Sequence, residues 1–216
     1  MPQIKICGIK APQMLEITIN AGADMVGFVY FEKSPRHVDI AEIKNLISIA
    51  SNKIKTVILT VNPSDEMLEK MTCLGADYLQ LHGNESLERV REIKQKYNIK
   101  IIKALGIGNK DDIIKVQNFY DIVDLIILDA KPKKDAPRPG GLGKIFDWDL
   151  LKQLDDKIDY MLSGGLDEIN VTNAISSVKP FGLDVSSGVE ISSGIKDKDK
   201  IIKFIENAKL AAKRFN

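Results

Sequence analysis

The chain has 216 residues, of which 44% are hydrophobic and 28% are charged, and its formal net charge is +1. This length is enough for one sizeable hydrophobic core, and we expect a single domain that spans residues 1–216. The near-neutral charge gives no electrostatic reason to expect nucleic acid or an anionic membrane surface as a partner.

Short apolar runs alternate with helical patterns along the whole chain. The predicted strands are residues 3–7, 24–30, 55–61, 77–82, 99–105, 124–130, 160–164 and 181–186. The predicted helices are residues 11–21, 39–51, 63–74, 85–97, 109–119, 147–154, 167–178 and 197–213. Asn109 is typical of a helix N-cap, and Gly22 follows the first helix where a left-handed C-cap favours glycine.

This alternation predicts the fold class. A strand followed by a helix and another strand implies parallel pairing, and strands rich in Val, Ile and Leu suit a sheet covered on both faces. Eight units of about 27 residues each favour an α/β fold of the (β/α)8 type, a TIM barrel. The alternative is an open doubly wound sheet, whose first strand would ideally lead into a GxGxxG turn, and Cys7-Gly8-Ile9-Lys10 does not match that pattern.

Cysteine content and hydropathy narrow the class of protein further. Cys7 and Cys73 are the only cysteines, and their spacing matches neither a disulfide framework nor a zinc site. The N-terminus lacks the apolar core of a signal peptide, and no apolar run approaches the roughly 18 residues of a membrane span. We therefore expect a cytoplasmic protein without a zinc site.

In a (β/α)8 barrel the active-site groups lie at the carboxyl ends of the strands. The residues at these positions include a thiol, an arginine, a histidine and two carboxylates, which together are too polar for a core. They are Cys7, Arg36, His82, Asp129 and Asp184.

Glycine pairs after the last two strands predict a phosphate site. Ser163-Gly164-Gly165 ends the seventh strand, and Ser186-Ser187-Gly188 ends the eighth. The loops after these strands often bind phosphate in barrels, because glycine lets backbone N–H groups approach the anion. Either pair alone would be an ordinary turn, whereas both together favour a phosphorylated small-molecule substrate.

The segment after the sixth predicted strand is long. It runs from about residue 131 to 146 and contains Gly140-Gly141-Leu142-Gly143-Lys144, which lacks the spacing of a nucleotide P-loop. Loops of this length often cover active sites, and Lys144 could add positive charge to the phosphate pocket. The alternative is a flexible connection without a role in catalysis.

Cys7 and Asp129 are candidates for a base and an acid. A carboxylic acid in a dry pocket keeps its proton near neutral pH, and an ionised thiol is a competent base. An acid and a base on opposite sides of a sugar phosphate could open its ring and move a C–H proton. The alternatives are a capping role for Asp129 and a core thiol for Cys7.

Four further residues are expected near this pair. Arg36 could bind a substrate carboxylate with two hydrogen bonds, although a solvated surface arginine is the alternative. His82 is expected to contact the substrate region or to be structural, but not to be catalytic. Lys5 shares a strand face with Cys7 and needs a partner if it is buried, and Asp184 on the neighbouring last strand is the candidate.

The sequence resembles the phosphoribosylanthranilate isomerases of tryptophan biosynthesis. The resemblance covers essentially the whole chain and rests on KICGI (5–9), GADMVGFVY (22–30), KSPRHV (33–38), LQLHG (79–83), ILDA (127–130), GGLGKIFDW (140–148), LSGGL (162–166) and DVSSGVE (184–190). It implies a TIM barrel that converts N-(5'-phosphoribosyl)anthranilate to 1-(2-carboxyphenylamino)-1-deoxyribulose 5-phosphate without a metal or a cofactor. The chain departs from the family pattern in VILTVN of the third strand, in the leucine of GGLGK, and in the lysine- and proline-rich tract from Lys131 to Arg138.

The resemblance also implies roles for individual residues. Cys7 would be the base, Asp129 the acid and Arg36 the ligand of the anthranilate carboxylate. The phosphate contacts would be Gly164, Gly165, Ser187 and Gly188, with His82 and Asp184 completing the substrate-binding set. We expect a monomer, with a homodimer as the alternative.

Four other functions agree less well with these residues. The related isomerase of histidine biosynthesis uses two aspartates, which Cys7 argues against. A lyase or synthase would need a Glu/Lys pair at strand ends, and a non-catalytic sugar-phosphate sensor would not need an intact acid and base. A redox role for Cys7 would require Cys73, which is predicted on an outer helix.

Overall fold

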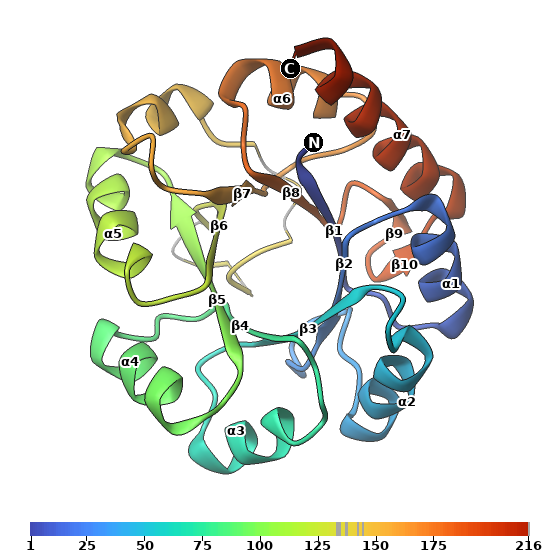
Figure 1. Ribbon diagram of the computed structural model, residues 1–216, viewed down its shortest axis with the longest axis vertical. Coiled ribbons are helices and arrows are strands. Elements are labelled where there is room, and N and C mark those ends of the chain that lie inside the picture. The colour runs from blue at the N-terminus through green and yellow to red at the C-terminus, as the bar shows by residue number, and fades with distance from the viewer. Residues whose placement is uncertain (133–134, 137, 142, 144, 216) are drawn as a thin grey trace.

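Eight parallel strands form a closed barrel in which each strand pairs with its sequence neighbours and β8 pairs with β1 (Figure 1). The structure is a computed structural model, and it describes residues 1–132, 135–136, 138–141, 143 and 145–215. The barrel strands are β1 (Gln3–Cys7), β2 (Met25–Val29), β3 (Lys55–Thr60), β4 (Tyr78–Leu81), β5 (Lys100–Ile107), β6 (Leu125–Ala130), β7 (Tyr160–Leu162) and β8 (Gly182–Val185). The predicted (β/α)8 barrel is confirmed.

Helices cover the outside of the barrel (Figure 1). They are α1 (Pro12–Ala21), α2 (Ile40–Ala50), α3 (Asp65–Thr72), α4 (Leu87–Lys96), α5 (Lys110–Tyr120), η1 (Trp148–Gln153), α6 (Val171–Val178) and α7 (Lys198–Phe215). Two predicted helices differ in detail: η1 is a 3₁₀ helix, and α6 begins four residues later than expected, after a turn stabilised by Asp167 and Asn170. The short hairpin of β9 (Glu190–Ser192) and β10 (Ile195–Lys196) was not predicted.

The helix boundaries follow from local chemistry. Ser64, Ser86 and Asn109 each accept a hydrogen bond from a backbone N–H in the first turn of the helix that follows. Gly22 ends α1 with φ of 82°, a left-handed conformation that glycine adopts without steric cost. The predicted caps at Asn109 and Gly22 are confirmed.

Alternate residues of each strand belong to different hydrophobic clusters. One face, represented by Ile4 and Ile6 on β1, packs with the helices in the main core. The other face points into the barrel, where Met25, Val57 and Ile127 belong to a small interior cluster made of strand residues. Cys7 lies in a third cluster with Val29 and Leu59, one layer nearer the carboxyl ends of the strands. Inward-pointing residues at the strand ends therefore line the mouth of the barrel.

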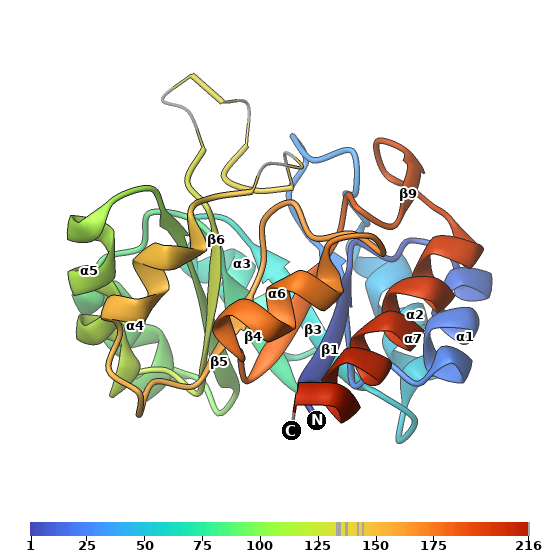
Figure 2. The same cartoon turned by 90° about the horizontal axis from the view of Figure 1, so that it is seen from above.

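The two faces of the barrel differ in what covers them. Both chain ends lie on one face, whereas the segment after β6 and the β9–β10 hairpin extend from the other (Figure 2). This second face is the one at which Cys7 and the other strand-end residues lie. Within the described residues, no helix is both long and apolar enough to cross a membrane.

Candidate active site

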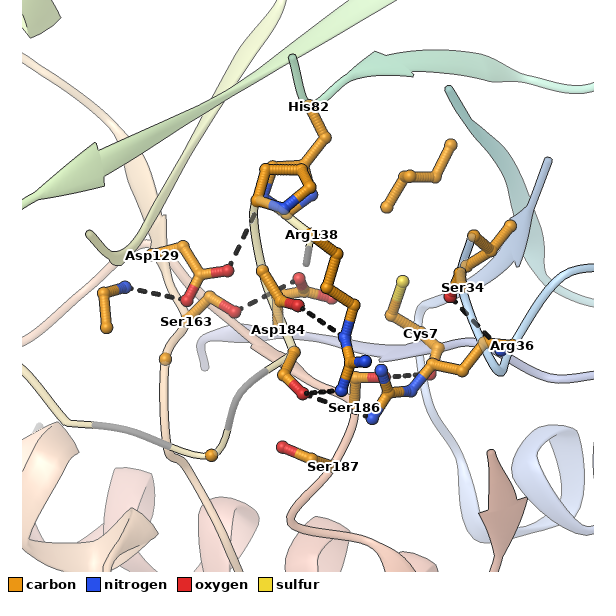
Figure 3. Close-up of a pocket in the computed structure, with 18 of the residues that line it drawn as sticks. Cys7, Ser34, Arg36, His82, Asp129, Arg138, Ser163, Asp184, Ser186 and Ser187 are labelled. Carbon is orange, nitrogen blue, oxygen red and sulfur yellow. Dashed lines mark hydrogen bonds and ion pairs between the residues drawn. The ribbon is translucent and has the colours of Figure 1, made fainter. Parts of the chain in front are cut away.

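A cavity opens at the carboxyl ends of the barrel strands and contains nearly all of the predicted site residues (Figure 3). Its polar lining residues come from six strand ends and from the segment after β6. They include Cys7, Ser34, Arg36, His82, Asp129, Arg138, Ser163, Gly164, Gly165, Asp184, Ser186 and Ser187. The structure therefore brings together residues that are up to 180 positions apart in the chain.

Cys7 is the last residue of β1 and is buried, with only 4% of its surface exposed. The residue opposite it on β2 is Gly27, and a Cβ atom there would lie 2.9 Å from the Cys7 Sγ and 3.3 Å from the Lys5 Nζ. Glycine at this position thus leaves space for the thiol beside the ammonium group. Burial raises the pKa of the Cys7 thiol, and the positive charge of Lys5 opposes this effect.

Lys5 forms the predicted ion pair with Asp184. The Nζ of Lys5 lies 2.7 Å from Oδ1 of Asp184, and the two residues are direct partners in the β1–β8 register. Burial acts to lower the pKa of Lys5, but the charges of Asp184 and Cys7 outweigh it, so that the pKa lies above its usual value. Lys5 is therefore a fully buried ammonium ion next to the candidate base.

Asp129 is the penultimate residue of β6 and its side chain points into the same cavity (Figure 3). Its Oδ1 accepts a hydrogen bond of 2.7 Å from the N–H of Ala130, and its Oδ2 lies 3.5 Å from Nε2 of His82. A Cβ atom on Gly140 would come within 2.6 Å of that same Oδ2. The segment after β6 thus passes directly over the carboxyl group, and its glycine allows the close approach.

Arg36 is also buried in the cavity wall, but it has a partner that the sequence did not reveal. Its Nε and Nη2 donate hydrogen bonds of 2.7 and 2.8 Å to the two oxygens of Glu190. Lys196 donates to the same carboxylate at 2.9 Å and also holds Ser186 through its backbone oxygen. The Nε and Nη2 groups of Arg36, which could have bound a substrate carboxylate with two hydrogen bonds, are therefore already bound to Glu190.

Burial and neighbouring charges have opposite effects on the pKa values of Glu190 and Lys196. Burial acts to raise the pKa of Glu190, but Arg36 and Lys196 outweigh it and the pKa lies below its usual value. Burial lowers the pKa of Lys196 to about 8, and the negative charge of Glu190 only partly opposes this. Glu190 is therefore ionised at neutral pH, when most of the lysine carries its proton.

The predicted phosphate residues lie at one side of the cavity, with one exception. Gly164 and Gly165 have φ angles of 84° and 66°, the left-handed conformation that favours glycine. Together with Ser187 they line the cavity. Gly188 does not line it, because its backbone pairs with Asp167 in an isolated bridge and packs against Leu166. Leu142 and Lys144 of the glycine-rich segment lie outside the described residues.

Some lining residues carried no functional signal in the sequence. Arg138 lines the cavity, but in the sequence it is only the end of a lysine- and proline-rich tract. Glu190 and Lys196, which hold Arg36 and Ser186 from outside the lining, carry no functional signal in the sequence either. Among the described residues, no group of three or more His, Cys, Asp or Glu side chains is arranged to hold a metal ion.

A protein-family model and a known relative both match most of the chain. Residues 4–207 match the family model for N-(5'phosphoribosyl)anthranilate (PRA) isomerase. The N-(5'-phosphoribosyl)anthranilate isomerase of Rhizobium rhizogenes is 44% identical over 206 residues, which are 95% of this chain and 93% of that protein.

Solved structures of such isomerases are also similar. The crystal structure of phosphoribosyl anthranilate isomerase from Thermotoga maritima superimposes with a TM-score of 0.87 at 37% identity, covering 97% of this chain and 99% of the other. A second crystal structure of such an isomerase contains reduced 1-(o-carboxyphenylamino)-1-deoxyribulose 5-phosphate. It has a TM-score of 0.84 at 34% identity, with the same coverage of both chains.

Proposed function

The chain belongs to the N-(5'-phosphoribosyl)anthranilate isomerase family, and we propose that Cys7 is the base and Asp129 the acid of its reaction. The enzyme converts N-(5'-phosphoribosyl)anthranilate to 1-(2-carboxyphenylamino)-1-deoxyribulose 5-phosphate, a step of L-tryptophan biosynthesis. The observation that carries the assignment is geometric: a buried thiol on β1 and a buried carboxyl group on β6 point into one cavity.

The proposed mechanism begins at Asp129. Its carboxyl group donates a proton to the furanose ring oxygen, the bond from that oxygen to C1' breaks, and C1' and the anthranilate nitrogen form an iminium ion. The contact with His82 and the hydrogen bond from Ala130 hold this carboxyl group in place. Because the group is 5% exposed, little water competes for the proton that it donates.

Cys7 acts in the second half of the reaction. The iminium ion acidifies the hydrogen on C2', and the thiolate removes this proton to leave an enolamine. The enolamine becomes the ketose when C1' gains a proton and the C2' hydroxyl loses one, and exchange with water restores the thiolate and the carboxylic acid. Lys5 supports this step because its positive charge stabilises the thiolate next to it.

Two anionic groups of the substrate are assigned to separate parts of the cavity. We assign the phosphate to Gly164, Gly165 and Ser187, since left-handed glycines expose backbone N–H groups that can bind an anion. Gly188 is not part of the lining, so any contribution from it would be indirect. The anthranilate carboxylate is assigned to Arg36 and its surroundings.

The assembly and location of the enzyme are proposed on separate grounds. We propose a monomer, because the proposed base Cys7 and the proposed acid Asp129 meet in a cavity that forms within one barrel. The isomerase of Thermotoga maritima is described as dimeric, so a homodimer is the alternative that analytical ultracentrifugation would detect. Its role in amino-acid biosynthesis supports a cytoplasmic location, which cell fractionation would test.

An isomerase assay on active-site variants tests the proposal. Substrate is generated in situ from anthranilate, and its loss is followed by fluorescence. We expect Cys7→Ala and Asp129→Asn each to lower kcat at least about 100-fold, the usual range for loss of a general acid or base. Cys73→Ala is the matched control, because Cys73 is an exposed thiol and should be dispensable.

The possible results distinguish the proposed roles of Cys7 and Asp129 from the isomerase activity itself. A folded Cys7→Ala variant with wild-type turnover would show that the base is another group, although the enzyme is an isomerase. A similar result for Asp129→Asn would remove the proposed acid. Loss of activity in Cys73→Ala would mean that cysteine substitutions act through folding and not through chemistry.

A further inference from the structure

Arg138 reaches into the cavity from the segment after β6 and lies next to Arg36 (Figure 3). Its Nε donates a hydrogen bond of 3.2 Å to the carbonyl oxygen of Gly140, and its Nη2 donates one of the same length to Gly141. The Nη2 of Arg36 lies 3.5 Å from that same Gly141 oxygen. One backbone carbonyl therefore holds two guanidinium groups close together.

This part of the cavity carries more positive than negative charge. Three cations, Arg36, Arg138 and Lys196, lie around the carboxylate of Glu190, which forms ion pairs with Arg36 and Lys196 and also accepts a hydrogen bond from the N–H of Gly194. Among the residues that the structure describes, no carboxylate lies within 4.0 Å of Arg138. Burial lowers the pKa of Arg138, the charge of Arg36 adds to this effect, and the negative charge of Glu190 only partly opposes it.

The position of Glu190 decides what Arg36 can offer to a ligand. Because Nε and Nη2 of Arg36 are bound to Glu190, this edge cannot also form a paired contact with a substrate carboxylate. A second donor group would complete the site, and Arg138 is a guanidinium at the right place. Its hydrogen bonds to Gly140 and Gly141 use Nε and Nη2, and within the described part of the chain Nη1 has no hydrogen-bond partner and could donate to a ligand.

We propose that Arg138 binds the carboxylate of the anthranilate moiety jointly with Arg36, one guanidinium to each carboxylate oxygen. The inference rests on the proposed function of this cavity and adds a second residue that selects for the carboxylated aromatic ring. The phosphate is the competing anion, but its assigned residues follow β7 and β8, whereas Arg138 shares the Gly141 carbonyl with Arg36.

Two ligands that differ only in the carboxylate test this proposal. They are 1-(2-carboxyphenylamino)-1-deoxyribitol 5-phosphate and 1-phenylamino-1-deoxyribitol 5-phosphate, each prepared by reducing the condensation product of ribose 5-phosphate and the amine. Binding to the wild type, to Arg138→Gln and to Arg138→Lys is measured by titration calorimetry. Arg91→Gln, which removes an exposed arginine on α4, is the matched control for the loss of one positive charge.

The expected result is selective. Arg138→Gln should weaken binding of the carboxylated ligand at least about tenfold, since hydrogen bonds between charged groups are the strong ones, and should change binding of the other ligand less than about twofold. Arg138→Lys should recover part of the loss. In the isomerase assay Arg138→Gln should raise KM with kcat nearly unchanged, because the contact is equal in ground and transition states.

Other outcomes would overturn the proposal. An equal loss for both ligands would assign Arg138 to the phosphate or to the shape of the segment, and no loss for either would remove it from the site. If the wild type binds both ligands equally, the cavity has no carboxylate subsite, and the assignment of Arg36 would fail with that of Arg138. Isomerase turnover by the wild type would still stand in each case.

Discussion

Replacing Lys5 by Met would test whether the buried ammonium controls the candidate base. Met has a similar length but no charge, so the substitution removes the charge next to Cys7 and leaves the packing of β1 nearly unchanged. Both the Cys7 Sγ and the Lys5 Nζ lie within 3.3 Å of one point, the place where a Cβ atom on Gly27 would be. This shared point sets an upper limit on the distance between the two atoms.

The magnitude follows from this geometry. The two atoms can be at most about 6 Å apart, and at an effective dielectric constant of about 20 two unit charges at that separation interact by about 3 kcal/mol, or about two pKa units. Lys5→Met should therefore raise the pKa of Cys7 by about two units. Because the thiolate fraction below the pKa falls tenfold per unit, the rate of thiolate reactions at neutral pH should drop about 100-fold.

Alkylation by iodoacetamide measures this change directly. The rate is followed as a function of pH in a Cys73→Ser background, so that the exposed thiol does not contribute. The parent should show a reactive fraction that increases with pH, since burial raises the pKa of Cys7, and Lys5→Met should shift this curve to still higher pH. The value of kcat/KM should fall in parallel.

Stability is separated from reactivity by a second variant. Lys5→Met leaves Asp184 buried without its partner, which typically costs about 3–5 kcal/mol. Lys5→Met/Asp184→Asn should recover part of this stability. It should recover only part of the alkylation rate, because the charge of Asp184 raises the pKa of Cys7 by less than the charge of Lys5 lowers it. A Lys5→Met curve within about half a pKa unit of the parent would refute the reasoning.

Two further predictions concern the rest of the site. Gly75→Ala, with φ of 82° and no atom within 4 Å, should lose about 1–2 kcal/mol of stability in thermal unfolding and keep full activity. Gly164→Ala places a Cβ atom 2.6 Å from the Ala130 N and 2.9 Å from the Asp129 Oδ1 at φ of 84°, so it should lose more stability than Gly75→Ala and kcat should fall; equal activity in both variants would contradict the contact with Asp129. Since the native pKa of Glu190 is lowered, its ionised form contributes stability above the unfolded pKa of about 4.5, and this contribution is lost as pH falls through the lower native value. Glu190→Gln should therefore destabilise the protein in urea unfolding by about 3 kcal/mol at pH 7 and by less below pH 4, whereas a pH-independent difference would disprove the role of its charge.

The sequence was sufficient to predict the barrel and the position of the proposed acid and base. Short apolar runs separated by helical patterns imply parallel strands, and parallel strands present their carboxyl ends on one face. The placement of Cys7 and Asp129 at that face follows from counting residues along β1 and β6. Even the Lys5–Asp184 pair could be predicted, since closure of the barrel puts the last strand beside the first.

Other features depended on contacts that no local pattern records. Arg36 and Glu190 are 154 residues apart, and Glu190 lies on a strand of three residues, which is too short to show periodicity. The six residues of η1 likewise do not distinguish a 3₁₀ helix from an α-helix. In the same way, Arg138 has the local sequence of a surface loop.

The division has a physical cause. Apolar residues recur every few positions within an element, and the strands follow one another in chain order. The sequence by itself therefore determined the barrel, the face on which its strands end and the residues at those ends. The partners of Arg36 and Arg138 depend on where two long segments meet after the barrel has closed. Only the tertiary structure decided these contacts, because ion pairs and hydrogen bonds act over a few ångströms in space and leave no regular spacing in the chain.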